Sequence, residues 1–363
     1  MPGHGELAPI AAVFVLLLCA ILLFLLGRRV LSPDGSHRDP SGQAPGPERR
    51  KAAFVINPIK IDSERRRRAW ATEACRQVGL SEPLWLRTTP EDPGSGQTRQ
   101  ALDRGAGVIL AFGGDGTVRS VASELASTGI PLGILPAGTG NLFARNLGVS
   151  VSDLDDALQV AFGGTERTVD IGRAEIDVTG RDSAPRQESF LVMAGLGFDA
   201  EVMAEVEPRL KQKVGWWAYV VAGMRLLHGR RTKVAIRRDD GPPLVRRIRS
   251  VVIGNCGELT GGIQLMPEAR LDDGWLDVVV VSPRGVAGWA AVAAAVLTRS
   301  RRHHTIVDHF RCRKIEIRAE RPLHVQMDGD PSGTAKVLRV HVDPSALTVR
   351  SPMPRIPWKP WNG

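Results

Sequence analysis

The stretch that decides the fold is Val108-Ile-Leu-Ala-Phe-Gly-Gly-Asp-Gly-Thr117. Its first five residues are apolar and partly β-branched, which predicts a buried strand. Apolar residues at helical spacing from Val118 to Leu125 predict a helix directly after it. A strand, a glycine-rich turn and a helix in this order are typical of a phosphate site, because glycines let backbone N–H groups converge on an anion at a helix N-terminus.

Asp115 is the unusual residue of this turn. A carboxylate among phosphate-binding amides is repulsive unless it handles a cation, a ribose hydroxyl or a proton. A second glycine-rich turn, Pro136-Ala-Gly-Thr-Gly-Asn141, follows the next predicted strand at residues 132–135. No Walker A loop occurs in the chain. The two turns and their aspartate therefore indicate chemistry on a nucleotide rather than a plain anion site.

The N-terminal region is predicted to be a membrane anchor followed by a linker. Residues 8–26 are uncharged and apolar, and they are long enough to cross a bilayer as a helix. Arg28 and Arg29 follow, so the positive-inside rule places the rest of the chain in the cytoplasm. A cleaved signal peptide is the weaker alternative, because no basic residue precedes the apolar stretch. We expect a transmembrane helix over residues 1–31, a disordered linker over 32–50, and a single-pass cell-membrane protein with its catalytic domains on the cytoplasmic side.

The sequence pattern of the remainder of the chain predicts two domains, an α/β domain followed by a β-rich domain. Strands alternate with helices over residues 51–165, which favours a three-layer α/β domain with a parallel sheet. Over residues 166–352 short strands of alternating polarity favour a mostly antiparallel β domain, followed by a tail over 353–363. Helices are also expected at 216–227 and 286–297. The expected strands are 53–56, 84–88, 108–112, 132–135, 190–193, 234–236, 251–253, 276–281, 314–317, 323–327 and 338–342.

Composition narrows the class of partner. A hydrophobic content of 43% is that of a globular protein. The net charge of +9 indicates an anionic partner, but aromatics make up only 5% and no nucleic-acid motif occurs, so an anionic membrane surface or a polyphosphate fits better than nucleic acid. The run Arg65–Arg68 is interpreted as a solvated helix face, with a membrane contact as the alternative. The scattered cysteines Cys19, Cys75, Cys256 and Cys312 indicate reduced thiols.

The two glycine turns together resemble the catalytic domain of the diacylglycerol kinase family, whose relatives include sphingosine and ceramide kinases. The resemblance extends from Ala53 nearly to the C-terminus. It is carried further by Asn57-Pro58, Gly197-Phe-Asp-Ala200, Asp272-Asp-Gly274 and Asp328-Gly-Asp330. This resemblance implies a two-domain fold that binds ATP with Mg²⁺ in its cleft and phosphorylates a lipid hydroxyl.

The resemblance also implies roles for individual residues. The family's acidic pair near the C-terminus is usually Asp-Gly-Glu, with the Glu as general base. Asp330 takes that position here, one methylene shorter, and Asp328 would orient it or bind the catalytic cation; Asp115 is the third catalytic candidate. Without the resemblance, Asp328-Gly-Asp330 indicates a hairpin turn. Many members have Asn where this chain has Arg119. The ATP-binding candidates are Asn57, Pro58, Thr88, Thr89, Gly113, Gly114, Gly116, Thr117, Gly138, Thr139 and Asn141.

A structural metal site is implied as well. Relatives place Mg²⁺ near the Asp-Asp-Gly sequence, which here corresponds to the Asp273 carboxylate and backbone oxygens around Arg270 and Trp275. Oxygen ligands suit such a hard cation, although the sequence by itself indicates a turn. His303, His304 and His309 are assigned to a basic solvated loop, because no pattern of carboxylate partners accompanies them.

The favoured function is an ATP-dependent lipid kinase that converts diacylglycerol to phosphatidic acid. Its partners would be ATP, the lipid and an anionic membrane surface. One alternative is an NAD kinase-like enzyme, whose Gly-Gly-Asp-Gly turn is similar; the apolar N-terminus and the later Asp-Gly-Asp argue against it. Another is a non-enzymatic membrane protein that binds nucleotide or anionic lipid, against which the three intact aspartates argue. The acceptor lipid and the oligomeric state, a homodimer included, stay open.

Overall fold

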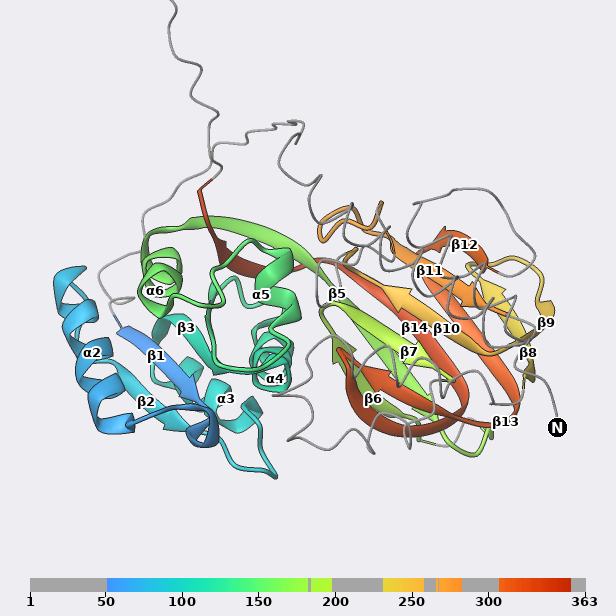
Figure 1. The fold of residues 1–363 in the computed structure, drawn as a ribbon, viewed down its shortest axis with the longest axis horizontal. Helices are drawn as coiled ribbons and strands as arrows, with labels where there is room; N and C mark the ends of the chain where they lie inside the picture. Colours follow the sequence, from blue (N-terminus) through green and yellow to red (C-terminus); the bar gives the residue numbers. More distant parts are fainter. Residues whose placement is uncertain are drawn as a thin grey trace, which may run out of the picture. The chain divides into compact units, whose positions relative to one another are not determined.

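The computed structural model describes residues 51–181, 184–197, 231–257, 266, 268–282 and 307–353 (Figure 1). All of them belong to the compact unit Pro45–Gly363. The linker over residues 32–50, the helices expected at 216–227 and 286–297, and the tail beyond residue 353 lie outside the described residues.

The predicted membrane anchor requires a correction. Among the described residues, no helix is long and apolar enough to cross a membrane. The longest helix of this part, α2, has 14 residues, whereas a bilayer needs about 20. The apolar stretch 8–26 lies outside the described residues. The predicted localisation, a single-pass protein of the cell membrane with cytoplasmic catalytic domains, is therefore wrong as judged by this structure.

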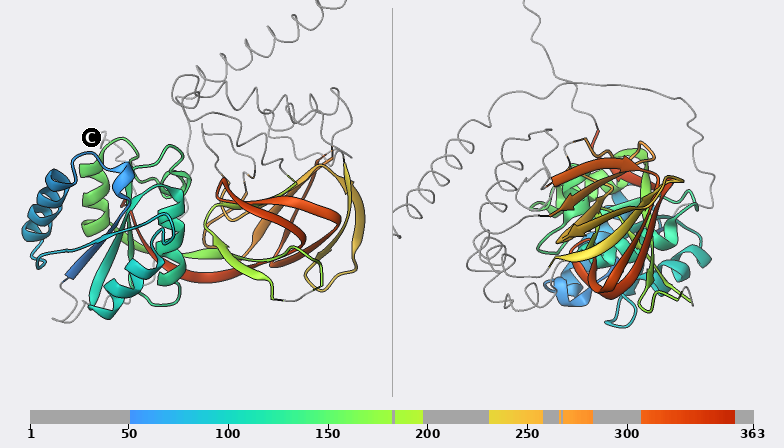
Figure 2. Two further views of the ribbon diagram at one scale, coloured as in Figure 1. Left: turned by 90° about the horizontal axis from the view of Figure 1, so that it is seen from below. Right: turned by 90° about the vertical axis from the view of Figure 1, so that its right-hand side faces the viewer.

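The first part of the chain forms a parallel sheet between helices (Figures 1 and 2). Adjacent strands pair in parallel in the order β4-β3-β1-β2. Helices α2 and α6 cover one face, and α3 and α4 cover the other (Figure 2), as right-handed crossovers require when the chain reverses direction across a sheet. The elements are β1 (Lys51–Ile56), η1 (Pro58–Lys60), α2 (Glu64–Gln77), β2 (Leu84–Arg87), α3 (Ser95–Asp103), β3 (Ala106–Gly113), α4 (Asp115–Leu125), β4 (Leu132–Pro136), α5 (Leu142–Asn146) and α6 (Leu154–Gly163).

The central strand β3 explains why this sheet forms. Ile109, Leu110, Ala111 and Phe112 are buried on both sides of it, with at most 1% of their surface exposed. Burying each large apolar side chain contributes about 1.5–3 kcal/mol, so a continuous apolar run is stable only as an interior strand.

The second part of the chain is built from antiparallel strands. Most of their buried residues form a second apolar core, and a small third cluster contains Val252, Met266, Val279 and Val281. The elements are β5 (Thr165–Asp177), β6 (Arg186–Phe190), β7 (Met193–Leu196), β8 (Thr232–Arg238), β9 (Leu244–Ile248), β10 (Ser250–Gly254), β11 (Leu276–Val281), β12 (Val307–Cys312), β13 (Lys314–Met327) and β14 (Asp330–Ser351).

Two long strands connect the two parts. β5 pairs with β14 along most of its length, and the end of β14 pairs in parallel with β4 at Val349 and Leu132. Val169 on β5 and Leu347 and Val349 on β14 belong to the core of the first part. The predicted boundary at residue 165 thus falls at the start of a strand that serves both parts, and the C-terminal end of β14 returns to the first one.

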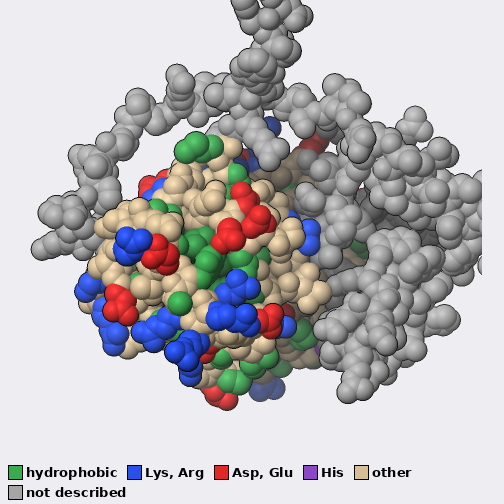
Figure 3. All heavy atoms as spheres, turned by 60° about the vertical axis from the view of Figure 1, so that its left-hand side comes forward, with side chains coloured by type: hydrophobic (Ala, Val, Ile, Leu, Met, Phe, Trp, Pro, Cys, Tyr) green, Lys and Arg blue, Asp and Glu red, His purple; other side chains and the backbone are tan. Residues whose placement is uncertain are grey.

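The arginine run on α2 lies on an exposed, mixed-charge surface. Arg68 lies 3.7 Å from Glu82, and Arg87 of β2 pairs with Glu64 at 2.8 Å. Figure 3 shows acidic side chains interspersed among the basic ones on the face that it displays. This arrangement favours the interpretation of the run as a solvated helix face.

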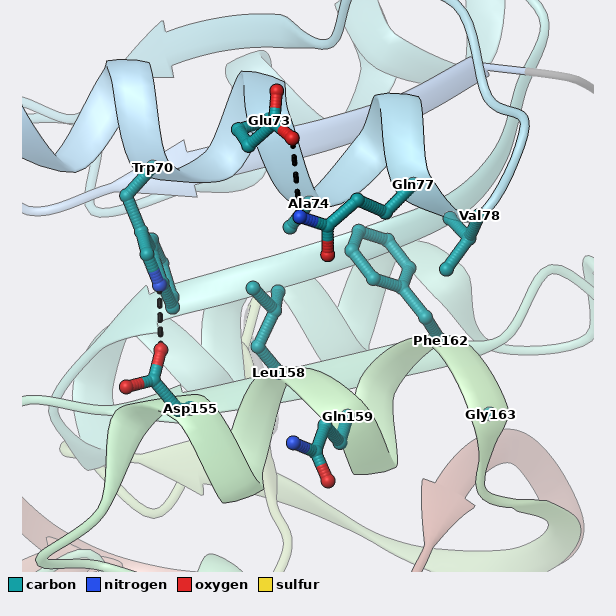
Figure 4. Close-up of a pocket in the computed structure, with 10 residues that line it drawn as sticks. All are labelled: Trp70, Glu73, Ala74, Gln77, Val78, Asp155, Leu158, Gln159, Phe162 and Gly163. Carbon is teal, nitrogen blue, oxygen red and sulfur yellow. Dashed lines mark hydrogen bonds between the residues drawn. The ribbon is translucent and has the colours of Figure 1, made fainter.

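A cavity of about 490 Å³ separates α2 from α6 (Figure 4). Trp70 and Phe162 border it, and the Trp70 Nε1–H group donates to Asp155 Oδ1 at 2.6 Å. None of the predicted site residues lines this cavity. It belongs to the packing between two helices on one face of the sheet.

Candidate active site

The two glycine turns lie side by side because they follow adjacent parallel strands. The Ala137 N–H group donates to the Gly113 carbonyl oxygen at 2.9 Å. A Cβ atom added to Gly138 would lie only 2.7 Å from the Gly114 Cα atom. Gly138 therefore has no room for a side chain, and the two turns meet because the strands before them, β3 and β4, are neighbours in the sheet.

Asp115 ties the turns together. It is the first residue of α4, and its Oδ1 atom accepts a hydrogen bond of 2.6 Å from the Leu142 N–H group at the start of α5. Burial raises the pKa of this carboxyl, and the backbone donor at Leu142 opposes that rise. One carboxylate oxygen is thus committed to the protein fold.

The polar residues of the two turns have different environments. Asn141 is buried, and its side chain closes the second turn by accepting from Gly138 N at 3.0 Å and donating to Gly138 O at 2.8 Å. Thr117 is buried beneath Gly113, whereas Thr139 is exposed. Thr139 is therefore accessible to a ligand, and Asn141 maintains the shape of the turn.

Residues at the ends of β1 and β2 extend the same sheet edge. The Asn57 N–H group donates to Phe112 O at 2.9 Å, which places it beside the end of β3. Its side-chain Oδ1 caps the short η1 helix that Pro58 begins, by accepting from Ile59 N at 3.1 Å. Thr88 is buried and Thr89 is exposed. All the predicted nucleotide residues thus gather at the carboxyl edge of four parallel strands, although only some of them are accessible.

Asp328 lies in the tight turn between β13 and β14 and is almost fully buried. Its Oδ1 accepts backbone hydrogen bonds from Val192 at 2.8 Å and Met193 at 3.1 Å, and its Oδ2 accepts one from Leu191 at 3.1 Å. Burial raises the pKa of this carboxyl, while the Arg119 guanidinium and the three amides act in the opposite direction. Its lone pairs are largely occupied, so Asp328 fits a role in fixing the turn better than a role in proton transfer.

Asp330, two residues later, is exposed to solvent, unlike Asp328. Its side chain is 53% exposed, and Oδ2 would lie 3.2 Å from a Cβ atom added to Gly116. The β13–β14 turn therefore places a solvent-accessible carboxylate directly over the first glycine turn. The hairpin predicted from the Asp-Gly pair is present, and it brings Asp330 beside Gly116.

Arg119 is the site residue that the sequence analysis did not select. It lies one helical turn after Asp115 on α4, and its side chain is 19% exposed. Nη1 donates to Met327 O at 2.7 Å and lies 3.6 Å from Asp328 Oδ2, and Nη2 pairs with Asp330 Oδ2 at 3.0 Å. Its spacing of four residues from Asp115 was the available signal, because it puts both side chains on one helix face.

The predicted metal site has a different composition. The Asp273 carboxylate accepts from Trp275 N at 3.1 Å through Oδ1, and its Oδ2 pairs with the Arg311 guanidinium. Arg311 Nε also lies 3.3 Å from the Oδ2 atom of Asp277. No group of three or more His, Cys, Asp and Glu side chains suited to a metal occurs among the described residues. The Mg²⁺ ligands predicted here were the Asp273 carboxylate and backbone oxygens around Arg270 and Trp275. In the structure that carboxylate pairs with Arg311.

His309 also requires a correction. It lies on strand β12 rather than in a loop, and its Nε2 atom is 3.1 Å from Oδ1 of the buried Asp277. The strand was missed because its sequence, Val-Asp-His-Phe-Arg-Cys, is polar and acquires its regularity by pairing with β11. His303 and His304, like Phe198, Asp199 and Ala200 of the family motif, lie outside the described residues.

Comparisons with known proteins agree with this geometry. The model of the diacylglycerol kinase catalytic domain matches residues 51–174, and that of the YegS C-terminal NAD kinase beta sandwich-like domain matches residues 192–351. The chain belongs to the diacylglycerol kinase family of lipid kinases. A Pseudomonas aeruginosa protein named "Probable lipid kinase YegS-like" is 32% identical over 309 residues, which make up 83% of this chain and 94% of that protein. The predicted family and the prediction of a kinase are confirmed.

Further members of the lipid kinase family show the same extent of likeness. A Bacillus subtilis diacylglycerol kinase is 28% identical over 288 residues, which make up 78% of this chain and 91% of that protein. The crystal structure of a Bacillus anthracis diacylglycerol kinase superposes with a TM-score of 0.64 at 24% identity and covers 83% of this chain and 97% of that one. The two-domain α/β fold with a mixed sheet is thereby confirmed.

Proposed function

We propose that this kinase transfers the γ-phosphate of ATP to a hydroxyl group of a membrane lipid, with diacylglycerol as acceptor and phosphatidic acid as product. The first domain (residues 51–165) would bind the nucleotide, and the second (166–352) the lipid. The supporting observation is the Asp330 carboxylate, whose Oδ2 stands 3.2 Å from the Cβ position of Gly116. A group able to accept a proton thus lies over a turn that is suited to phosphate oxygens.

The glycine turn would position the triphosphate. Phosphoryl transfer is catalysed mainly by positioning and by neutralising charge on the phosphate oxygens. The N–H groups of residues 113–117 at the start of α4 would bind those oxygens, and Thr139 would contribute from the rim of the second turn. Asn57, Pro58, Thr88 and Thr89 would border the nucleotide at the neighbouring strand ends.

Asp330 would act as the general base. As the lipid oxygen attacks the γ-phosphorus, the bond from that phosphorus to the bridging oxygen of ADP breaks, and the hydroxyl proton passes to the Asp330 carboxylate. General-base assistance of this kind contributes about 10²–10⁴-fold. Asp328, held by three backbone amides, would fix the turn that carries Asp330.

ATP would enter with a divalent cation, which we propose is Mg²⁺. Mg²⁺ in kinases is held by one or two carboxylates together with the phosphates of the substrate. Asp115 fits this role, because its carboxylate lies between the two glycine turns, with Oδ1 oriented by the Leu142 N–H group. The bound ion would neutralise phosphate charge. The structural Mg²⁺ predicted at Asp273 does not fit, since Arg311 already pairs with that carboxylate.

The positive charge of the chain would assist access to the acceptor. A net charge of +9 attracts the protein to an anionic bilayer. We propose an encounter at the bilayer surface, where the lipid hydroxyl is presented.

The test is transfer of labelled γ-phosphate from ATP to diacylglycerol in mixed micelles, with Mg²⁺ present. We expect labelled phosphatidic acid, and we expect Asp115→Ala to abolish it. Asp103→Asn is the matched control, because Asp103 is exposed at the end of α3, on the opposite edge of the sheet. Parallel reactions contain total membrane lipid or NAD as acceptor. Labelling of NAD alone, or of no acceptor, would contradict the proposal, and labelling of another lipid would replace diacylglycerol as the substrate.

A further inference from the structure

Arg119 joins α4 to the β13–β14 turn through three different groups. Its guanidinium donates to the Met327 carbonyl oxygen at 2.7 Å, pairs with Asp330 Oδ2 at 3.0 Å and lies 3.6 Å from Asp328 Oδ2. The residues it connects are more than 200 positions apart in the chain. The planar fork of an arginine suits such a multiple contact, whereas a lysine ammonium could maintain only part of it.

The two aspartates depend on Arg119 to different degrees. Asp328 is already fixed by the N–H groups of Leu191, Val192 and Met193. For the Asp330 side chain, by contrast, the hydrogen bond and ion pair that the described residues provide come from Arg119. An exposed carboxylate without such a partner would sample several rotamers. Arg119 therefore restricts the rotamers of Asp330, the carboxylate of the turn that the backbone amides do not hold.

The geometry of the pair leaves the carboxylate usable. The guanidinium contacts Oδ2 of Asp330, which is also the oxygen nearest Gly116, and both carboxylate oxygens keep lone pairs that can accept a proton. The Asp330 side chain has a single methylene, so it reaches the glycine turn only if the hairpin stays against α4. The bond from Arg119 to Met327 O holds the hairpin backbone at that distance.

We propose that Arg119 is a positioning residue, which holds the β13–β14 turn against α4 and orients Asp330 for its reaction. This role rests on the proposed function, in which Asp330 is the base. Arg119 acts through Asp330 rather than on the phosphate. Misplacing a reacting group by about 1 Å can cost about 10²-fold in rate, so this contact has a kinetic consequence.

The test compares Arg119→Gln with Arg119→Lys and with the control Arg99→Gln. Arg99 forms an exposed ion pair with Glu124 of α4 at 2.9 Å but does not contact the turn. We expect Arg119→Gln to lower kcat by about 10–100-fold with little change in the KM for ATP. Arg119→Lys should recover part of the loss, and Arg99→Gln should retain the wild-type kcat. A raised KM for ATP at unchanged kcat would overturn the proposal by showing that Arg119 binds the nucleotide.

A double substitution separates positioning from direct catalysis. If Arg119 acts through Asp330, Arg119→Gln will lower kcat no further once Asp330→Asn is present. A further loss of the same size as in the wild-type background would overturn the proposal.

Hydrogen exchange tests the contact without any substrate. Amides of residues 327–330 should exchange faster in Arg119→Gln than in the wild type or in Arg99→Gln. Unchanged exchange would refute the positioning role. Faster exchange in a protein that phosphorylates no lipid would refute the proposed function instead and leave the structural contact established.

Discussion

Two arginines in this structure each pair with two aspartates, and the pairs differ in exposure. Arg119 joins α4 to the β13–β14 turn, and Asp330 in that turn keeps 53% of its side chain exposed. Arg311 lies on β12 and pairs with Asp277 on the adjacent strand β11 and with Asp273 in the loop before β11. The Asp277 side chain is only 1% exposed. Each cluster also has a second aspartate, Asp328 at 2% and Asp273 at 21% exposure, so only the cluster around Arg119 has a carboxylate that is more than half exposed. Accessibility, rather than residue type, therefore separates a reactive cluster from a structural one.

The largest effect is expected from Asp330→Asn, which tests whether the exposed carboxylate is the reactive one. The amide is nearly isosteric but cannot accept the hydroxyl proton, so we expect kcat to fall by about 10²–10⁴-fold with ATP binding retained. Steady-state kinetics and calorimetric titration with ATP would measure the two effects. Asp273→Asn is the matched control from the enclosed cluster, and its kcat per folded molecule should equal that of the wild type. Equal activity of Asp330→Asn would move the base elsewhere, with Asp115 as the next candidate.

Asp328→Asn tests the enclosed member of the first cluster. The Asn carbonyl oxygen can still accept the Oδ1 hydrogen bonds from Val192 and Met193, but its NH₂ group would replace Oδ2, which accepts from Leu191 and lies 3.6 Å from Arg119. Losing this buried acceptor beside Leu191 and Arg119 costs about 1–3 kcal/mol in the free energy of unfolding. Urea denaturation would measure the change. An unchanged midpoint would show that the carboxylate charge does not matter for the turn.

The contrast between the clusters also shows what the sequence could and could not predict. The two glycine turns and the parallel strands before them were predicted, because the pattern of each is local and adjacent strands place their ends together. The full length of β14 was not, since Gly333 and Pro344 interrupt its apolar pattern, and the strand is maintained by pairing with β13 around Gly333 and with β5 on both sides of Pro344.

The arginine contacts were harder to predict for a different reason. Arg119 could be placed on the same helix face as Asp115, but its partner Asp330 is 211 residues away. Arg311 is 38 residues from Asp273, on strand β12, which the sequence pattern did not reveal. Such partners are set by the fold of the whole sheet. The family resemblance could therefore select Asp328, Asp330 and Asp273 as candidates, but it could not assign the arginine that each one meets.

Arg311→Gln tests whether the second cluster, formed by Arg311, Asp273 and Asp277, contributes to stability rather than to catalysis. Asp277 is buried and would lose the guanidinium beside its Oδ2 atom, while the His309 Nε2 atom would remain 3.1 Å from its Oδ1 atom. We expect unfolding to require about 1–2 kcal/mol less free energy, measured in urea. The kcat of the folded fraction should be unchanged, because the side chain contacts neither glycine turn. A large loss of kcat at unchanged stability would assign the second cluster to the active site.

The smallest expected effect concerns divalent cations in the absence of ATP. The Arg311 guanidinium already balances Asp273 and Asp277, so neither Mg²⁺ nor a chelator should shift the Tm of the wild type. In Arg311→Gln the same two carboxylates lack this guanidinium, and added Mg²⁺ should raise the Tm by stabilising the folded state. A gain of 1 kcal/mol corresponds to about 2–4 °C in a domain of this size, which scanning calorimetry can measure. If the wild type lost several degrees on chelation, a cation rather than Arg311 would hold this loop, and the two clusters would no longer differ in the way the structure indicates.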